Sequence, residues 1–108
     1  MAQDKCYVFQ GTASVNDTVL QSGGVDYTPG QGRMFVIRAA AFFNGNAAIQ
    51  QAKLKAGETY MISVNLESST ACIEDCRNAV VLSGEKIMVK AGVDNDIKYR
   101  VWGTEMDI

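Results

Sequence analysis

Short stretches of alternating apolar and polar side chains run through most of the chain. In the clearest stretch, Ile97, Tyr99 and Val101 alternate with Lys98, Arg100 and Trp102. A period of two is that of a β-strand with one face buried. Similar alternation occurs at 59–66 and 85–91. The pattern predicts strands at 5–10, 13–20, 25–28, 34–43, 48–54, 59–66, 79–82, 85–91 and 97–104.

The predicted strands are separated by turn residues at short and regular intervals. Gly and Asn recur between them, for example in Pro29-Gly-Gln-Gly32 and Asn44-Gly-Asn46. These residues accept the positive φ angles that tight turns need. Many short strands with such turns indicate a sandwich or a barrel and leave little room for helix. We expect an all-β, antiparallel β-sandwich of about eight strands, with residues 1–108 forming one domain.

The segment 34–43 departs from simple alternation because both of its faces are apolar. One parity includes Met34, Val36 and Phe42, and the other includes Phe35 and Phe43. Such a strand fits between the opposite sheet and a neighbouring subunit; the alternative is a bulge or a helical turn within the alanine run. The side chains that we expect at an interface are Phe35, Phe43, Met88, Arg100 and Trp102.

Residues 68–78 show no clear period. We expect this segment to be an excursion loop that holds one helical turn around Cys72 to Cys76. Loops of β-domains often carry binding specificity.

The charge of the chain argues against some classes of partner. The 108 residues carry a net charge of -2, and the ten basic residues are scattered along the sequence. Phosphate binding needs clustered Lys and Arg, so we expect no nucleic-acid partner. No apolar stretch approaches the roughly 20 residues that cross a bilayer, so we expect no membrane partner. The first residues have no apolar core of a signal peptide, which predicts synthesis in a cytoplasm.

Candidate chemistry is sparse. The chain has no His, which removes the usual partner of a nucleophile and the commonest transition-metal ligand. The acidic residues Glu67, Glu74, Asp75, Asp94 and Asp96 fall in predicted loops and strand ends, where charged side chains are common. We therefore expect no catalytic residues, no bound metal and no cofactor, and we do not expect an enzyme.

The three cysteines do not form a recognisable metal or redox motif. Cys72 and Cys76 are one residue further apart than the pair of a C-x-x-C site. In a cytoplasm the default is three reduced thiols, with Cys6 packed as a small hydrophobic residue. A disulfide between Cys72 and Cys76 is the alternative, if the protein later meets an oxidising medium.

Four motifs follow one another along the chain. They are Tyr27-Thr-Pro-Gly-Gln-Gly-Arg33, Leu54-Lys-Ala-Gly-Glu-Thr59, Val81-Leu-Ser-Gly-Glu-Lys-Ile-Met-Val-Lys-Ala91 and Ile97-Lys-Tyr-Arg-Val-Trp-Gly-Thr-Glu105. Their order resembles that of the small accessory virion proteins of tailed bacteriophages, a group of capsid decoration and head or tail accessory proteins. The resemblance covers about residues 27–105 and leaves out the segment around Cys72 and Cys76. It implies a jelly-roll-like sandwich, often trimeric, that decorates capsids, sits on tails or caps fibres.

The resemblance and the absence of catalytic groups together predict a structural role. We expect a bacteriophage capsid decoration or cement protein that stabilises the virion by contacts with its own copies, a trimer being favoured. Its other partner would be the major capsid protein or another virion protein. The alternative is a tail-tip or fibre module that binds a cell-surface glycan through exposed aromatic rings near Trp102 or the 68–78 segment. The expected location is the virion, after synthesis in the host cytoplasm.

Overall fold

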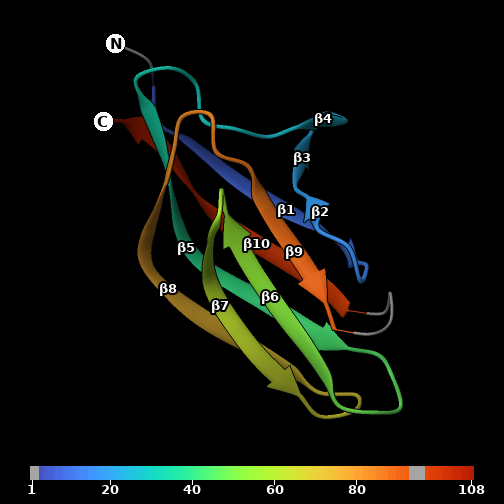
Figure 1. Cartoon of the computed structure of the whole chain (residues 1–108). Coiled ribbons are helices and arrows are strands. Elements are labelled where there is room, and N and C mark those ends of the chain that lie inside the picture. The colour runs from blue at the N-terminus through green and yellow to red at the C-terminus, as the bar shows by residue number, and fades with distance from the viewer. Residues whose placement is uncertain (1–2, 93–96) are drawn as a thin grey trace.

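The computed structural model of the chain describes residues 3–92 and 97–108, which form ten β-strands. The strands are β1 (Lys5–Ala13), β2 (Thr18–Val19), β3 (Gln21–Ser22), β4 (Val25–Asp26), β5 (Arg33–Asn44), β6 (Gln50–Ala56), β7 (Thr59–Leu66), β8 (Ala71–Leu82), β9 (Ile87–Ala91) and β10 (Ile97–Asp107). Figure 1 shows their course. Asp94 and Asp96 lie outside the described residues. Among the described residues there is no helix long and apolar enough to span a membrane.

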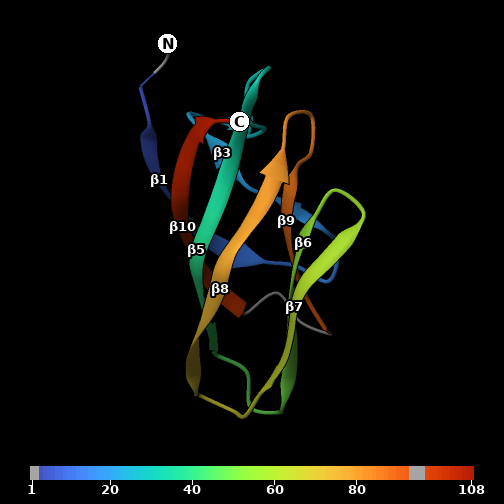
Figure 2. The ribbon, with the colours of Figure 1, turned by 90° about the vertical axis from the view of Figure 1, so that its left-hand side faces the viewer.

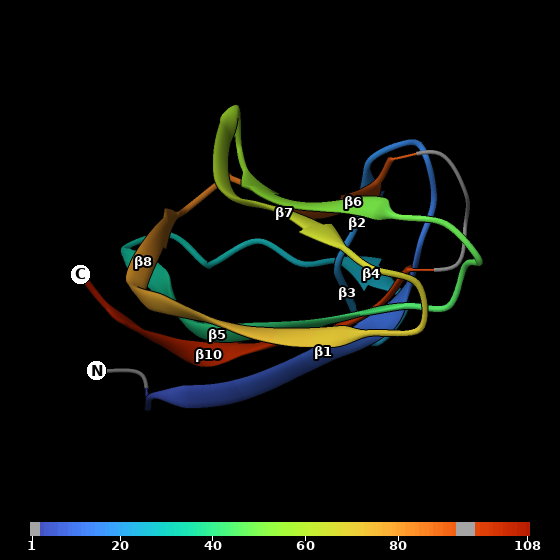
Figure 3. The same ribbon diagram turned by 90° about the horizontal axis from the view of Figure 1, so that it is seen from below.

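Eight of the strands form two antiparallel sheets that pack face to face (Figure 3). Sheet A has the order β1-β10-β5-β8, and sheet B has the order β2-β9-β6-β7. Without the small β3–β4 hairpin, these orders are first-eighth-third-sixth and second-seventh-fourth-fifth along the chain. This is the strand order of a jelly roll. The expected all-β sandwich is therefore confirmed, with the β3–β4 hairpin added to its eight main strands.

The core consists of the inward-facing residues of both sheets. Alternation places Ile97, Tyr99 and Val101 of β10 inward, as predicted, and β6 and β9 each bury every second residue. Four aromatic rings meet near the β1 side, with centroids 4.9 to 6.2 Å apart: Tyr7, Phe9, Tyr27 and Phe35. Such tilted and edge-on ring pairs add to the burial energy of the core.

A polar cluster lies at the end of the sandwich where β5 begins and β10 ends. The Tyr27 hydroxyl donates a hydrogen bond to Glu105 Oε1 at 2.7 Å, and Arg33 Nε donates to Glu105 Oε2 at 2.6 Å. Arg33 Nη1 also donates to Asp107 Oδ1 at 2.6 Å. Three residues of the motifs at 27–33 and 97–105 thus meet in space. The cluster links the connection between β4 and β5 to the end of β10.

Buried Asn44 holds the opposite end together. Its side-chain Nδ2 donates to the carbonyl oxygens of Ala48, Leu66 and Glu67 at 2.9 to 3.1 Å. Because these acceptors lie in two different connections, one amide fixes both the β5–β6 and the β7–β8 segments.

Three sequence predictions about strands are wrong or incomplete. The predicted strand at 13–20 is mostly loop, because only Thr18–Val19 pairs with β9. The expected loop with a helical turn at 68–78 is instead the first part of β8, which pairs with β5 from residue 71 onward. The alternation predicted at 59–66 is interrupted by an extra residue of β7, Met61, and Tyr60 lies over Lys53 and Lys55.

The missing period of β8 has a physical cause. Three residues, Cys76 to Asn78, bulge out of the strand opposite Arg38 of β5. Arg77 and Asn78 adopt φ angles of 50° and 60°, and a bulge of this kind shifts the inward parity of the residues that follow it. Cys72 and Val81 both face the core, although an uninterrupted period of two would put them on opposite faces.

Candidate contact surface

The outer face of sheet A is built from alternate residues of four paired strands. The register aligns them in rows across the sheet, such as Cys6, Thr104, Val36 and Val80, and then Val8, Trp102, Ala39 and Asp75. In antiparallel strands, residues directly opposite each other point to the same face. The rows therefore define one continuous surface over β1, β10, β5 and β8 (Figure 2).

Most side chains on the half of this face that covers β5 and β8 are apolar, and Arg38 and Asp75 lie among them. We call this half the β5–β8 patch, and its main side chains are Met34, Val36, Phe43, Ile73, Val80 and Leu82. Ile73 is 73% exposed, Leu82 52%, Val80 42% and Phe43 37%. Val36 is already buried by its neighbours on the same face. Several large exposed apolar side chains on one sheet face are typical of a contact surface.

The outer face of sheet B is different in composition. Its two central strands, β6 and β9, present Lys53, Lys55 and Lys90 between their buried residues. Ser63 and Asn65 of β7 are exposed beside them. The sandwich thus has one largely apolar outer face and one largely polar one.

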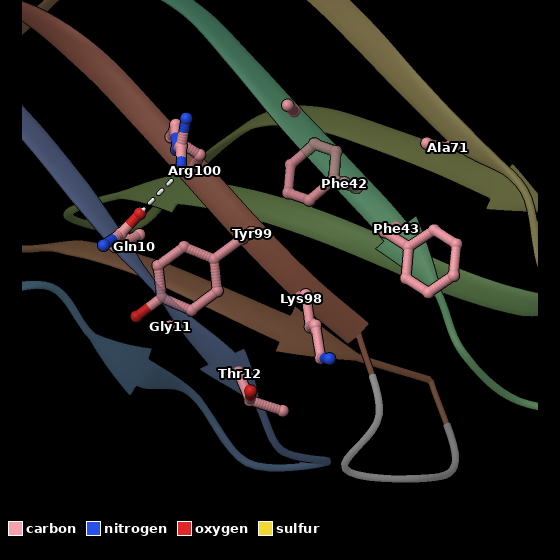
Figure 4. Close-up of a pocket in the computed structure, with 10 residues that line it drawn as sticks. Gln10, Gly11, Thr12, Phe42, Phe43, Ala71, Lys98, Tyr99 and Arg100 are labelled. Carbon is pink, nitrogen blue, oxygen red and sulfur yellow. Dashed lines mark hydrogen bonds between the residues drawn. The ribbon is translucent and has the colours of Figure 1, made fainter.

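A shallow hollow of about 590 Å³ lies at one end of the outer face of sheet A (Figure 4). Ala41 and Ala71 form part of its floor, and Phe43, Lys98 and Arg100 stand around it. The small side chains of two alanines between larger neighbours create the depression. Arg100 Nη2 donates a hydrogen bond to Gln10 Oε1 at 2.9 Å, which fixes the guanidinium at the rim.

The charged groups on this face are mainly positive. Arg38, Lys98 and Arg100 are exposed there, against one carboxylate of the face, Asp75. Arg38 Nη1 donates to Asn78 Oδ1 at 2.5 Å across the bulge. A partner that fits this surface has apolar side chains to cover the patch and acidic groups to meet these three cations.

The structure separates the five side chains that were predicted to lie at an interface. Phe43, Arg100 and Trp102 lie together on the outer face of sheet A, with Trp102 half-buried between Val8 and Ala39. Met88 is half-buried on the outer face of sheet B. The prediction for Phe35 is wrong, because its ring is fully buried against Phe9 and Tyr27. Because both faces of 34–43 are apolar, the sequence did not show which of them points into the core.

The cysteines also depart from expectation. Cys6 is exposed on the outer face of sheet A, with its sulfur 4.0 Å from Thr104 Oγ1, and is not packed in the core. Cys72 and Cys76 are free thiols on β8. Residues four apart on an extended strand are separated by roughly 13 Å, which is beyond disulfide reach. The strand therefore excludes the bridge that we considered.

Burial makes the two thiols of β8 poor nucleophiles. Burial, with the nearby carboxylates of Asp75 and Glu74, raises the pKa of Cys76 to about 11. Burial also raises the pKa of Cys72, helped by Glu74. Because the thiolate is the reactive form, these groups are structural.

The exposed residues of β8 were missed by sequence reasoning. Ile73, Val80 and Leu82 are exposed in the structure because they point outward from β8, which is an edge strand. Ile73 and the apolar run at 79–82 were a signal, but the bulge between them hid which of these residues share a face. Among the described residues no three His, Cys, Asp or Glu side chains gather to hold a metal ion.

The fold and this surface define a class of protein: a jelly-roll sandwich with one exposed apolar sheet face. No protein-family model matches the chain, and no curated protein matches its sequence. A solved structure from work on Bacillus endospore appendages, described as a novel family of disulfide-linked pili, has a similar fold. The TM-score is 0.53 at 6% identity, over 98% of this chain and 88% of that chain.

A second solved structure comes from infectious bursal disease virus, Gt strain. Its TM-score is 0.35 at 12% identity, over 95% of this chain and 31% of that chain. At that score the likeness carries no argument about this chain. The first likeness supports the sandwich fold alone.

Proposed function

We propose that the chain is a structural subunit of a multi-copy particle, and most specifically a decoration protein of a bacteriophage virion. The observation that carries the proposal is the β5–β8 patch, where Ile73, Val80 and Leu82 are exposed on the outer face of sheet A. Leaving such a surface in water is unfavourable, so its burial supplies the energy of attachment. The resemblance of the motif order at 27–105 to that of virion proteins supports a bacteriophage virion as the particle.

The proposed occupant of the patch is an apolar region of a shell protein with acidic side chains around it. Lys98 and Arg100 lie on β10 beside the patch and Arg38 lies within it, so all three can meet acidic side chains of the shell protein. Many identical weak contacts on a lattice add up to firm attachment through avidity. The spore-appendage structure with the same fold is described as forming pili, so a multi-copy role is compatible with this fold.

The glycan-binding alternative is less well supported. Sugar recognition needs exposed aromatic rings around a groove. Within the described lining of the hollow, Phe43 is the aromatic ring with substantial exposure, whereas Phe42 and Tyr99 are buried. The 68–78 segment, which was to supply a binding loop, is largely part of β8.

The test is incorporation into particles made by the cells that encode the chain. Purified particles are examined by mass spectrometry and immunogold electron microscopy for the wild-type chain and for Ile73→Glu with Val80→Glu. We expect the wild type in fixed stoichiometry and incorporation of the double variant reduced at least about tenfold, because two exposed anchors are replaced by charges.

Ser63→Glu with Asn65→Glu is the matched control. It places the same charges on β7, at exposed positions of the outer face of sheet B, and should leave incorporation unchanged. Circular dichroism must show that both variants fold. Absence of the wild-type chain from particles, or normal incorporation of the Ile73 and Val80 variant, would overturn the proposal.

A further inference from the structure

The free edges of the two sheets differ in how well they are protected against pairing with another strand. An edge strand exposes a row of unpaired backbone groups, and proteins block such rows with short strands, bulges or charges. β2 has two residues, β7 contains the extra residue Met61, and β8 contains the bulge at 76–78 beside Glu74 and Asp75.

Residues 6–13 of β1 carry none of these protective features. The strand has nine residues, and each of them pairs in unbroken register with β10, from Lys5 opposite Glu105 to Ala13 opposite Ile97. Residues 6–13 include no charge and no proline. Val8, in the middle of the strand, is 63% exposed. Within the described residues no strand pairs with the other side of β1.

The space beside β1 is also open. A hollow of about 440 Å³ lies between β1 and the short strands β2 to β4, and Phe9 and Gln10 contribute to its lining. The hollow leaves free space beside Phe9 and Gln10 of β1.

We propose that β1 pairs antiparallel with β1 of a second copy and joins the two A sheets into one continuous eight-stranded sheet. Antiparallel pairing of identical strands is closed by a two-fold axis, so it yields a dimer instead of the trimer that the resemblance implied. With Phe9 at the axis, all nine residues of the strand pair. Val8 then lies opposite Gln10 of the partner subunit, and Cys6 opposite Thr12 of the partner subunit.

The pairing has a consequence for attachment to a particle, and this consequence rests on the proposed function. A two-fold axis perpendicular to the sheet keeps both outer faces on the same side. The β5–β8 patches of the two copies then lie at opposite ends of one surface and face the same way. A dimer can attach to a lattice at two points at once, which raises its effective affinity.

The first test measures the mass of the isolated chain by light scattering and sedimentation. We expect a dimer, and its dissociation constant should rise at least about tenfold in Val8→Lys, since a charge enters the middle of the joined strands. Val25→Lys is the matched control, because Val25 is 69% exposed on β4, away from the edge, and it should dimerise normally. A monomer or a trimer would overturn the pairing, as would normal dimerisation of Val8→Lys.

The second test uses the native thiol of Cys6. Cross-strand neighbours lie close enough for a disulfide. Thr12→Cys should therefore form covalent dimers with Cys6 of the partner subunit on oxidation with copper phenanthroline. The same substitution combined with Cys6→Ser should not form them. Gln10→Cys detects a register shifted by two residues and would equally support pairing through β1. Failure of both cysteines to cross-link overturns the pairing. A monomer that still enters particles would overturn the pairing and leave the proposed function intact. A dimer that is absent from particles would overturn the proposed function and leave the pairing intact.

Discussion

Gly103 on β10 shows how one residue without a side chain allows two strands to pack closely. A Cβ atom at this position would collide with the backbone carbonyl oxygen of Val36 and lie 2.8 Å from the ring of Phe35. The collision is with backbone and with a fully buried ring, neither of which can move freely. The glycine is therefore required by the close approach of β10 to β5, beside Arg38, which is an extra residue of β5 in its pairing with β10.

Gly103→Ala should lower the free energy of unfolding by about 2–3 kcal/mol, the usual cost of overpacking a rigid site. Urea unfolding followed by circular dichroism measures the change. Gly30→Ala is the control, because the nearest atom to a Cβ there is Arg33 Cδ at 3.8 Å, and its effect should stay below about 0.5 kcal/mol. Equal stability of the two variants would show that sheet A is more loosely packed at Gly103 than described.

At the scale of single elements, the strands with regular alternation were predicted well. The segment 59–66 coincides with β7 and 97–104 lies within β10, because both repeat apolar residues at every second position. Only the end of β8 was predicted, as the strand at 79–82, since the bulge at 76–78 breaks the period and the inward residues before it include two cysteines. Periodicity alone gives no warning of such an interruption.

The contact surface was predicted in part for the same reason. Arg100 and Trp102 were placed correctly on an outward face, because the parity of 97–102 could be read directly, and Phe43 lies on the same face of sheet A. Ile73 and Val80 were missed, since their face depends on how β8 pairs with β5. That pairing joins residues whose separation in the sequence ranges from 28 to 48 positions, and it follows from the topology of the whole fold.

The reactivity of the cysteines tests the assignment of β8 as a strand that faces the core. At pH 8, iodoacetamide should label one of the three thiols quickly, Cys6, because Cys72 and Cys76 have raised pKa values and are half-buried. Mass spectrometry identifies the labelled residue. Cys6→Ser should remove the fast reaction, and urea should make all thiols accessible. Rapid labelling of Cys72 and Cys76 in the folded chain would contradict the strand.

At the scale of the whole molecule, the cluster of Tyr27, Arg33 and Glu105 makes stability depend on pH. Burial by itself raises the pKa of Glu105, but the hydrogen bonds from Tyr27 and Arg33 outweigh it and hold the pKa below its ordinary value of 4.5. A carboxyl whose pKa is lowered by folding stabilises the folded state above its unfolded pKa. That contribution is lost as the pH falls through the folded-state pKa.

Glu105→Gln should therefore destabilise the chain by about 1–2 kcal/mol at pH 7, where charge-assisted hydrogen bonds are lost. The difference from the wild type should shrink as the pH is lowered from about 5 towards 3, because the wild-type carboxyl is then protonated. Denaturant unfolding at several pH values measures it. A difference that stays constant across this range would show that the charge of Glu105 has no part in stability.

The position of β10 between β1 and β5 has a consequence for synthesis on the ribosome. β1 and β5 leave the exit tunnel early, but sheet A stays in two pieces until residues 97–107 follow them. Until then β1 has no partner strand on either side, and its apolar residues are exposed to other nascent chains. Translation of the last strand, and not local hairpin formation, therefore sets when this protein acquires its native structure.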